Sequence, residues 1–215
     1  INAVNFVDGL DGLATGIVGI SAACFFAFSY LLAVVNGFNR AGAPSLVTAV
    51  VLGMCLGFFP HNYHPARIFM GDSGAMLLGL LLSAAAITLT GQIDINAITG
   101  SKTTTLLPLL LPFAVLAIPL LDLVLAVIRR VRAGRSPFEA DSEHLHHKLL
   151  SMGLSHRRTA AILYSWTAAL AIPAVVAAFA PLWISFLIGI VILAISLYLL
   201  KDNHPWRERE KELIS

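Results

Sequence analysis

Six long apolar runs impose the main constraint on how this chain can fold. Several reach the roughly 20 residues that an α-helix needs to cross a bilayer, and flanking residues complete the two shorter ones. The chain is 58% hydrophobic and only 12% charged, which excludes an ordinary soluble globular domain. The sequence therefore predicts an all-α, polytopic membrane protein with six membrane helices, at Leu13 to Val35, Leu46 to Pro60, Ala75 to Thr90, Leu106 to Ile128, Ala160 to Ala180 and Leu182 to Leu200.

The basic residues lie almost entirely on one side of this arrangement. When the loops alternate across the membrane, twelve of the fourteen Lys and Arg residues share the side of residues 1–12, and only Arg40 and Lys102 lie opposite. The positive-inside rule places the richer side in the cytoplasm. All seven histidines are there too. We therefore expect a plasma-membrane protein with a cytoplasmic site for phosphorylated substrates and anionic lipids, and no nucleic-acid partner.

The first polar motif repeats an amide or a carboxylate every three residues, at Asn2, Asn5, Asp8 and Asp11. On one straight helix the first and last of these would drift to opposite sides, so only a break could bring all four together. Gly9 and Gly12 allow such a break. Converging oxygens would suit Mg²⁺, whereas an Asn/Asp turn with a capping carboxylate is the simpler interpretation. From this stretch alone, both stay open.

Two further acids stand out along the chain. Asp72 lies between two glycines where the third membrane helix is expected to begin, a place that suits a metal-bound phosphate. Considered alone, Asp72 is more simply a helix cap. Asp122 is the only acid well inside an apolar run. An intramembrane acid is a functional candidate by default, but we favour a structural partner for a helix end or for an arginine.

The largest cytoplasmic loop contains His144, His146 and His147 after an arginine-rich segment. On a continuous helix, His144 and His147 would share a face while His146 would point away, and no fourth zinc ligand is evident. Imidazoles among basic side chains suit a phosphate-rich ligand better than zinc.

Together, the motifs NAVNFVDGLDGLA, HNYHPARIFMGDSG and EHLHHKLL resemble the polyprenyl-phosphate N-acetylhexosamine-1-phosphate transferases. That superfamily includes phospho-N-acetylmuramoyl-pentapeptide transferase, and the resemblance covers nearly the whole chain. The His-x-His-His form is similar to the UDP-N-acetylglucosamine branch. It implies transfer of N-acetylglucosamine 1-phosphate from a UDP-sugar to a polyprenyl phosphate lipid, releasing UMP, as the first step of a cell-envelope polysaccharide. A homodimer is also plausible from the resemblance.

The resemblance also implies roles for particular residues. Asp72 and Asn5 would bind Mg²⁺, for which Mn²⁺ is an alternative, and Asp8 would lie near the reacting phosphates as a candidate base. The pyrophosphate or sugar would be held by His144, His146 and His147, with Arg135 as a further candidate. Phe69 would stack on the uracil, and the uridine pocket would also be lined by Gly9, Leu10, Asp11 and Asn62.

The chain departs from the family pattern at one point that matters. An adjacent Asp-Asp pair, found in the family on an earlier cytoplasmic loop, has no counterpart here, and the chain opens with Ile1 inside its most polar motif. We therefore expect residues 1–215 to be the C-terminal part of a single membrane domain that lacks N-terminal helices and needs them for activity. The alternatives are a muramoyl-pentapeptide transferase, a membrane transporter, or a non-catalytic nucleotide-binding remnant.

Overall fold

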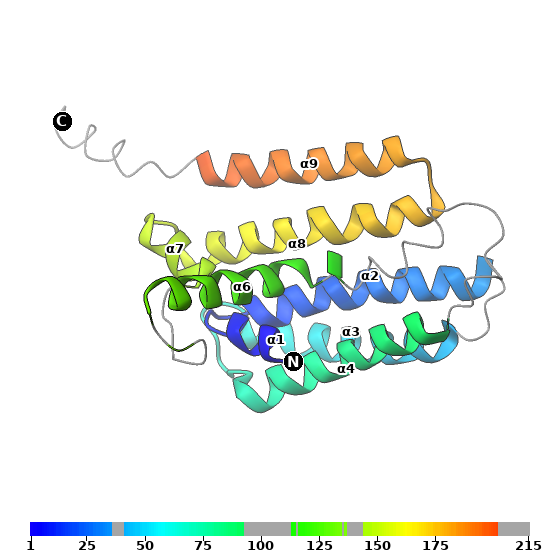
Figure 1. The fold of residues 1–215 in the computed structure, drawn as a ribbon, viewed down its shortest axis with the longest axis horizontal. Helices are drawn as coiled ribbons and strands as arrows, with labels where there is room; N and C mark the ends of the chain where they lie inside the picture. Colours follow the sequence, from blue (N-terminus) through cyan, green and yellow to red (C-terminus); the bar gives the residue numbers. More distant parts are fainter. Residues whose placement is uncertain (36–40, 93–112, 115, 135, 137–143, 202–215) are drawn as a thin grey trace.

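The computed structural model describes residues 1–35, 41–92, 113–114, 116–134, 136 and 144–201, and within them every regular element is a helix (Figure 1). The all-α prediction is confirmed for this part of the chain. The helices are α1 (Asn2–Val7), α2 (Leu13–Val35), α3 (Gly42–Asn62), α4 (Gly71–Gln92), α6 (Ala117–Arg132), α7 (Leu145–Ser151), α8 (His156–Phe179) and α9 (Leu182–Lys201).

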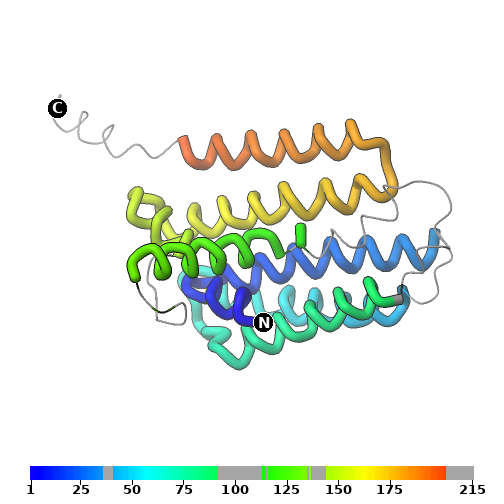
Figure 2. Tube along the Cα trace, in the orientation of Figure 1, coloured from blue at the N-terminus to red at the C-terminus, as the bar shows by residue number. Residues whose placement is uncertain are grey.

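Five of the described helices, α2, α3, α4, α8 and α9, are long and apolar enough to cross a membrane. They run side by side with their long axes roughly aligned (Figures 1 and 2). The sixth expected span, Leu106 to Ile128, is described only from α6 onward, because residues 106–112 and 115 lie outside the described part. The protein is thus a multi-pass membrane protein, with five complete spans and part of a sixth described.

α2 forms the centre of the bundle because it packs against α3 on one side and α8 on the other. Its large side chains, among them Phe25 and Phe28, are almost completely buried. α9 packs mainly on α8 among the described helices and leaves Trp183, Phe186 and Ile190 largely exposed. Such a surface is expected where a helix faces lipid rather than water.

The short helices gather at one end of the bundle. α1 contacts α4 and α6, and α7 contacts α8. The two short helices, which precede α2 and α8 in the chain, therefore lie at the same end of the bundle (Figure 1). α1 crosses α4 at Gly79, where a Cβ atom would come within 2.9 Å of the Ile1 backbone. This close crossing brings the first polar motif against the beginning of α4.

Candidate functional site

The predicted break in the first motif is present. α1 ends at Val7, the Asp8 N–H donates to the Asn5 carbonyl at 3.1 Å, and α2 begins at Leu13. Gly12 has a φ of +75°, in the left-handed region that favours glycine. The Tyr164 hydroxyl of α8 donates to the Gly12 carbonyl at 2.6 Å. The turn between α1 and α2 is therefore built by its glycines and anchored from α8.

Asp8 meets the beginning of α4. The N–H of Gly71, which has a φ of +66°, donates a hydrogen bond to the Asp8 carboxylate, and Asp72 lies near enough to act on its charge. Burial, and then the negative charge of Asp72, raise the pKa of Asp8 from 3.8 to about 6, while the Gly71 hydrogen bond opposes the shift. Two acids that are distant in the sequence thus form one anionic centre.

The donor atoms of this centre fit a hard divalent cation. Two neighbouring carboxylates repel each other until a cation lies between them. Asn5, three residues before Asp8, has a buried Oδ1 for which the described residues provide no hydrogen-bond partner. No group of three or more His, Cys, Asp or Glu side chains in the described part is arranged to hold a metal ion. Such a cation would therefore depend on waters or substrate phosphates for its other ligands, as Mg²⁺ commonly does.

Asp11 turns to a different partner from Asp8. Its Oδ2 lies 2.8 Å from the His64 Nδ1 and accepts the Ala66 N–H at 3.1 Å. Burial raises the pKa of Asp11, but the His64 and Ala66 hydrogen bonds outweigh it and leave the pKa below its ordinary value. The break therefore separates the carboxylates: Asp8 joins Asp72, whereas Asp11 secures the segment before α4.

Asn62 and Leu10, both assigned to the uridine pocket, contact other side chains of the bundle. The Asn62 Oδ1 accepts from the Thr15 hydroxyl at 2.6 Å, and its Nδ2 donates to the Ile68 carbonyl at 3.0 Å. Leu10 is buried in the core beside α8. Phe69, by contrast, is 74% exposed. An exposed aromatic ring has a face open to stacking, and the role of Phe69 at the uracil stays a prediction.

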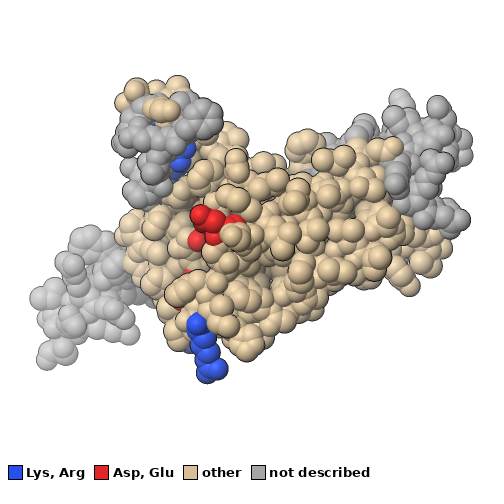
Figure 3. All heavy atoms as spheres, turned by 90° about the horizontal axis from the view of Figure 1, so that it is seen from below, with Lys and Arg blue, Asp and Glu red and all other residues tan. Residues whose placement is uncertain are grey.

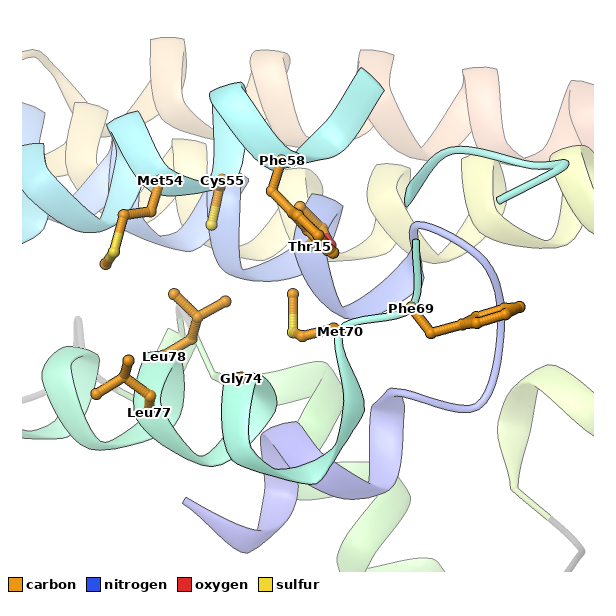
Figure 4. A pocket seen from close by; sticks show the side chains of 9 residues that line it. All are labelled: Thr15, Met54, Cys55, Phe58, Phe69, Met70, Gly74, Leu77 and Leu78. Atoms are coloured by element: carbon orange, nitrogen blue, oxygen red, sulfur yellow. The ribbon is translucent and has the colours of Figure 1, made fainter. Parts of the chain in front are cut away.

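A hollow of about 200 Å³ lies between α3 and α4, next to this loop (Figure 4). In Figure 4, Met54 and Cys55 of α3 face Leu77 and Leu78 of α4 across it, whereas the Phe69 ring points away from them. The lining is almost entirely apolar, so this space suits a hydrocarbon group better than a phosphate.

The arrangement of the three histidines differs from the helical expectation, which is wrong at His144. This residue is the N-cap of α7 and has an extended backbone, with φ −66° and ψ 160°. Its ring therefore lies parallel to that of His146, with centroids 5.8 Å apart and an interplanar angle of 2°. The ring centroids of His146 and His147 are 4.2 Å apart. All three rings form one cluster because the helix begins after His144.

His146 connects this cluster to the first motif. A Cβ atom on Gly9 would lie only 2.5 Å from the His146 Nε2, so the absence of a side chain at Gly9 leaves room for the ring. His146 is 2% exposed and its Nε2 has no hydrogen-bond partner in the described part. Burial, then the charges of His147 and His144, lower its pKa from 6.5 to about 4, against the opposing effect of Asp122.

Asp122 meets the beginning of a helix, as the structural interpretation predicts. Its Oδ1 accepts the N–H of Leu145, the first residue of α7, at 2.9 Å, and its Oδ2 lies 3.0 Å from the His144 Nδ1. Sequence reasoning missed Tyr164 and the stacked pair His64–His156, whose centroids are 4.8 Å apart. No spacing in the sequence distinguishes these residues. Arg135 lies outside the described residues.

Acidic side chains form one small patch on the face shown in Figure 3, within a largely uncharged surface. The described residues contain only four acids, Asp8, Asp11, Asp72 and Asp122. Two of these form the centre at the beginning of α4, and the other two bind histidines. The described acidic groups are thus concentrated at the end of the bundle where the polar motifs meet.

Comparison with known proteins identifies the group to which this arrangement belongs. Residues 1–90 match the family model described as glycosyl transferase family 4. Decaprenyl-phosphate N-acetylglucosaminephosphotransferase of Mycobacterium tuberculosis is 53% identical over 168 residues, which are 77% of this chain and 42% of that protein. Probable undecaprenyl-phosphate N-acetylglucosaminyl 1-phosphate transferase of Bacillus subtilis is 36% identical over 89% of this chain and 49% of its own length.

A more distant relative carries the other expected activity in its name. Phospho-N-acetylmuramoyl-pentapeptide-transferase of Desulforudis audaxviator is 35% identical over 79% of this chain and 43% of that protein. The chain spans less than half the length of each of these three relatives.

Proposed function

We propose, from the premise that this chain belongs to glycosyl transferase family 4, that it forms part of an enzyme that attaches N-acetylglucosamine 1-phosphate to a polyprenyl phosphate. The donor would be UDP-N-acetylglucosamine and the second product UMP. The two relatives most similar to the chain among those described above carry names of this activity, and they exceed the muramoyl-pentapeptide relative in identity. The names of these two relatives thus favour the N-acetylglucosamine donor.

The observation that carries the proposal is the meeting of Asp8 with Asp72, beside a histidine cluster that packs on Gly9. The reaction brings two anions together, the lipid phosphate and the diphosphate of the UDP-sugar. Catalysis of phosphoryl transfer consists largely of positioning reactants and stabilising charge. An oxygen-rich cation site facing a group of imidazoles is suited to that task.

In the direct mechanism, Asp8 accepts a proton from the lipid phosphate. An oxygen of that phosphate then attacks the sugar-bound phosphorus of the UDP-sugar, and the bond between this phosphorus and the UMP oxygen breaks. Burial and the charge of Asp72 raise the pKa of Asp8 to about 6, which suits a base that works near neutral pH. In the alternative, an aspartate attacks first and forms a covalent intermediate.

Asp72 and Asn5 would hold Mg²⁺, or Mn²⁺ in its place, beside Asp8, and the bound ion would neutralise phosphate charge. The exposed Phe69 ring would stack on the uracil, and the imidazoles of His144, His146 and His147 would contact the pyrophosphate or sugar. The site would face the cytoplasm, where a soluble UDP-sugar meets a lipid whose tail remains in the bilayer. The apolar hollow between α3 and α4 could accept a segment of hydrocarbon beside this site.

The direct test measures UMP release and transfer of labelled sugar into the lipid phase. It uses membranes that contain this chain, or a longer protein that includes it, with UDP-N-acetylglucosamine, polyprenyl phosphate and Mg²⁺. We expect transfer that Asp72→Asn reduces by at least roughly a hundredfold, since this change removes a charge at the cation site. Full activity of Asp72→Asn would exclude the metal assignment.

Three measurements distinguish the alternatives. A clear preference for UDP-N-acetylmuramoyl-pentapeptide as the donor would favour the muramoyl branch. UMP release from the UDP-sugar without any lipid acceptor would support the covalent route over direct attack by the lipid phosphate. Substrate flux through proteoliposomes without sugar transfer would instead favour a transporter.

A further inference from the structure

Asp122 of α6 and His144 form a buried acid–histidine pair at the edge of the histidine cluster. We infer that Asp122 is a positioning residue, which holds the His144 imidazole in one tautomer and one orientation for the transfer reaction. This inference rests on the proposed function in assigning His144 to the phosphate-binding wall. The pair itself stands on geometry alone.

Both oxygens of the Asp122 carboxylate are occupied. Oδ2 lies 3.0 Å from the His144 Nδ1, and Oδ1 accepts the Leu145 N–H at 2.9 Å. Asp122 is 2% exposed and His144 is 7% exposed, so water does not compete freely for these bonds. A carboxylate accepts hydrogen bonds, and the Nδ1 of His144 must therefore carry the proton. The Nε2 is left as the nitrogen that can meet a ligand.

The His144 ring also lies against two other rings. Phe6 of α1 stacks on it at 5.6 Å with an interplanar angle of 26°, and the parallel ring of His146 lies 5.8 Å away. The Arg130 guanidinium of α6 lies 5.9 Å from the centre of the Phe6 ring. Side chains from α1, α6 and α7 thus determine where this imidazole lies.

A purely structural cap would need less than this arrangement supplies. The Leu145 N–H requires one acceptor, which a neutral Asn at position 122 could also provide. Among the described residues, the second oxygen forms a hydrogen bond with the imidazole. Asparagine has one acceptor oxygen, so in Asp122→Asn its NH₂ group would face the Nδ1 and move the imidazole proton to Nε2. This substitution has nearly the same shape as aspartate, yet it reverses the tautomer.

The tautomer can be observed without any activity measurement. In protein labelled with ¹⁵N-histidine and reconstituted in lipid nanodiscs, the His144 signals are identified by their loss in His144→Gln. We expect protonated Nδ1 in the wild-type protein and protonated Nε2 in Asp122→Asn. Asp122→Glu, which retains two acceptor oxygens, should return the proton to Nδ1. Leu121→Ala, at an exposed neighbouring position of α6, is the matched control and should leave the signals unchanged.

Kinetics of the same proteins test whether the position matters for transfer. Asp122→Asn should lower kcat by roughly tenfold or more while KM for UDP-N-acetylglucosamine stays within about twofold, as is typical of groups that orient a catalytic side chain. Asp122→Glu should recover part of the loss. In the double variant with His144→Gln, the loss should be no greater than for His144→Gln alone, because both changes remove one function.

An unchanged His144 tautomer in Asp122→Asn would overturn the inference, and so would strictly additive losses in the double variant. If Asp122→Asn does not fold, wild-type His144 with its proton on Nε2 would be equally decisive. The expected tautomers in wild type and Asp122→Asn, together with no sugar transfer even by a longer protein that contains this chain, would contradict the proposed function and leave the Asp122–His144 pairing intact.

Discussion

Two residues at the site are held in environments that disfavour charge, with opposite effects on their pKa values. Burial and Asp72 raise the pKa of Asp8 to about 6, while burial and the neighbouring histidines lower that of His146 to about 4. Groups whose pKa values are shifted this far are typical of functional sites, although structural networks produce them too. At neutral pH, His146 is a neutral imidazole against Gly9.

The shift at His146 makes stability depend on pH. Its pKa is about 4 in the folded protein and ordinarily 6.5, so between these values the unfolded chain binds more protons than the folded one. The contribution of His146 to the free energy of unfolding is therefore fully present above pH 6.5 and decreases as the pH falls toward 4. Thermal unfolding in detergent should show a steeper acid loss for wild type than for His146→Gln. The exposed His61→Gln is the control, and an equal slope in His146→Gln would contradict the assignment.

Gly9→Ala tests the contact between the first and third motifs. The added methyl group would lie 2.5 Å from the His146 Nε2, so the buried ring must move. We expect transferase activity to fall at least roughly tenfold while the bundle stays folded, because a small misplacement of a positioning group is costly in catalysis. Gly57→Ala provides the control, since nothing lies within 4 Å of a Cβ there. Equal activity of Gly9→Ala and Gly57→Ala would show that the contact is unimportant.

At the scale of elements, the first turns of α8 hold the other segments in place. Ser155 caps this helix by accepting the Arg158 N–H at 3.4 Å, His156 stacks on His64, and the Arg157 Nε donates to the His64 carbonyl at 3.3 Å. About two turns further on, Tyr164 packs against Gly16 and its hydroxyl donates a hydrogen bond to the Gly12 carbonyl. α8 therefore secures both the turn before α2 and the segment before α4.

Tyr164→Phe should loosen this attachment without leaving a cavity. It removes the hydroxyl that donates to Gly12 at 2.6 Å, and we expect the free energy of unfolding to decrease by about 1 kcal/mol. KM for the UDP-sugar should rise because the turn that carries Gly9 and Asp11 is less well held. Thermal unfolding and steady-state kinetics measure the two effects. Tyr198→Phe, at an exposed position of α9, should change neither; a Tyr164→Phe protein identical to it would argue against the anchor.

At the scale of the whole molecule, all the described polar motifs lie at one end of the helical bundle, and the α8–α9 turn lies at the other (Figure 1). From the distribution of Lys and Arg, we predict that the motif end faces the cytoplasm. Both native cysteines, Cys24 and Cys55, are buried and should not react with polar reagents. New cysteines can therefore report the orientation directly.

Met152→Cys, in the exposed turn after α7, should react with a membrane-impermeant maleimide only in inside-out vesicles. Pro181→Cys, at the exposed α8–α9 turn, should react in intact cells. The wild-type chain is the background control. Labelling of Met152→Cys in intact cells would reverse the predicted orientation.

The amino-acid sequence by itself determined the all-helical membrane class, the positions of the spans, the polar side of the bundle and the family. These properties follow from features that accumulate locally along the chain: the length of an apolar run, the sign of loop charges, and glycine where a turn is needed. The break after Val7 could be predicted for this reason, because Gly9 and Gly12 lie within the motif itself.

Only the tertiary structure decided which groups meet. Asp8 and Asp11 are close in sequence, yet one joins Asp72 and the other binds His64, 53 positions away. His144 lies just outside α7, where Asp122 of another helix accepts hydrogen bonds from its Nδ1 and from the Leu145 N–H. Tyr164 reaches Gly12 across 152 positions. Such pairings depend on how helices pack in three dimensions, and no local spacing in the sequence encodes them.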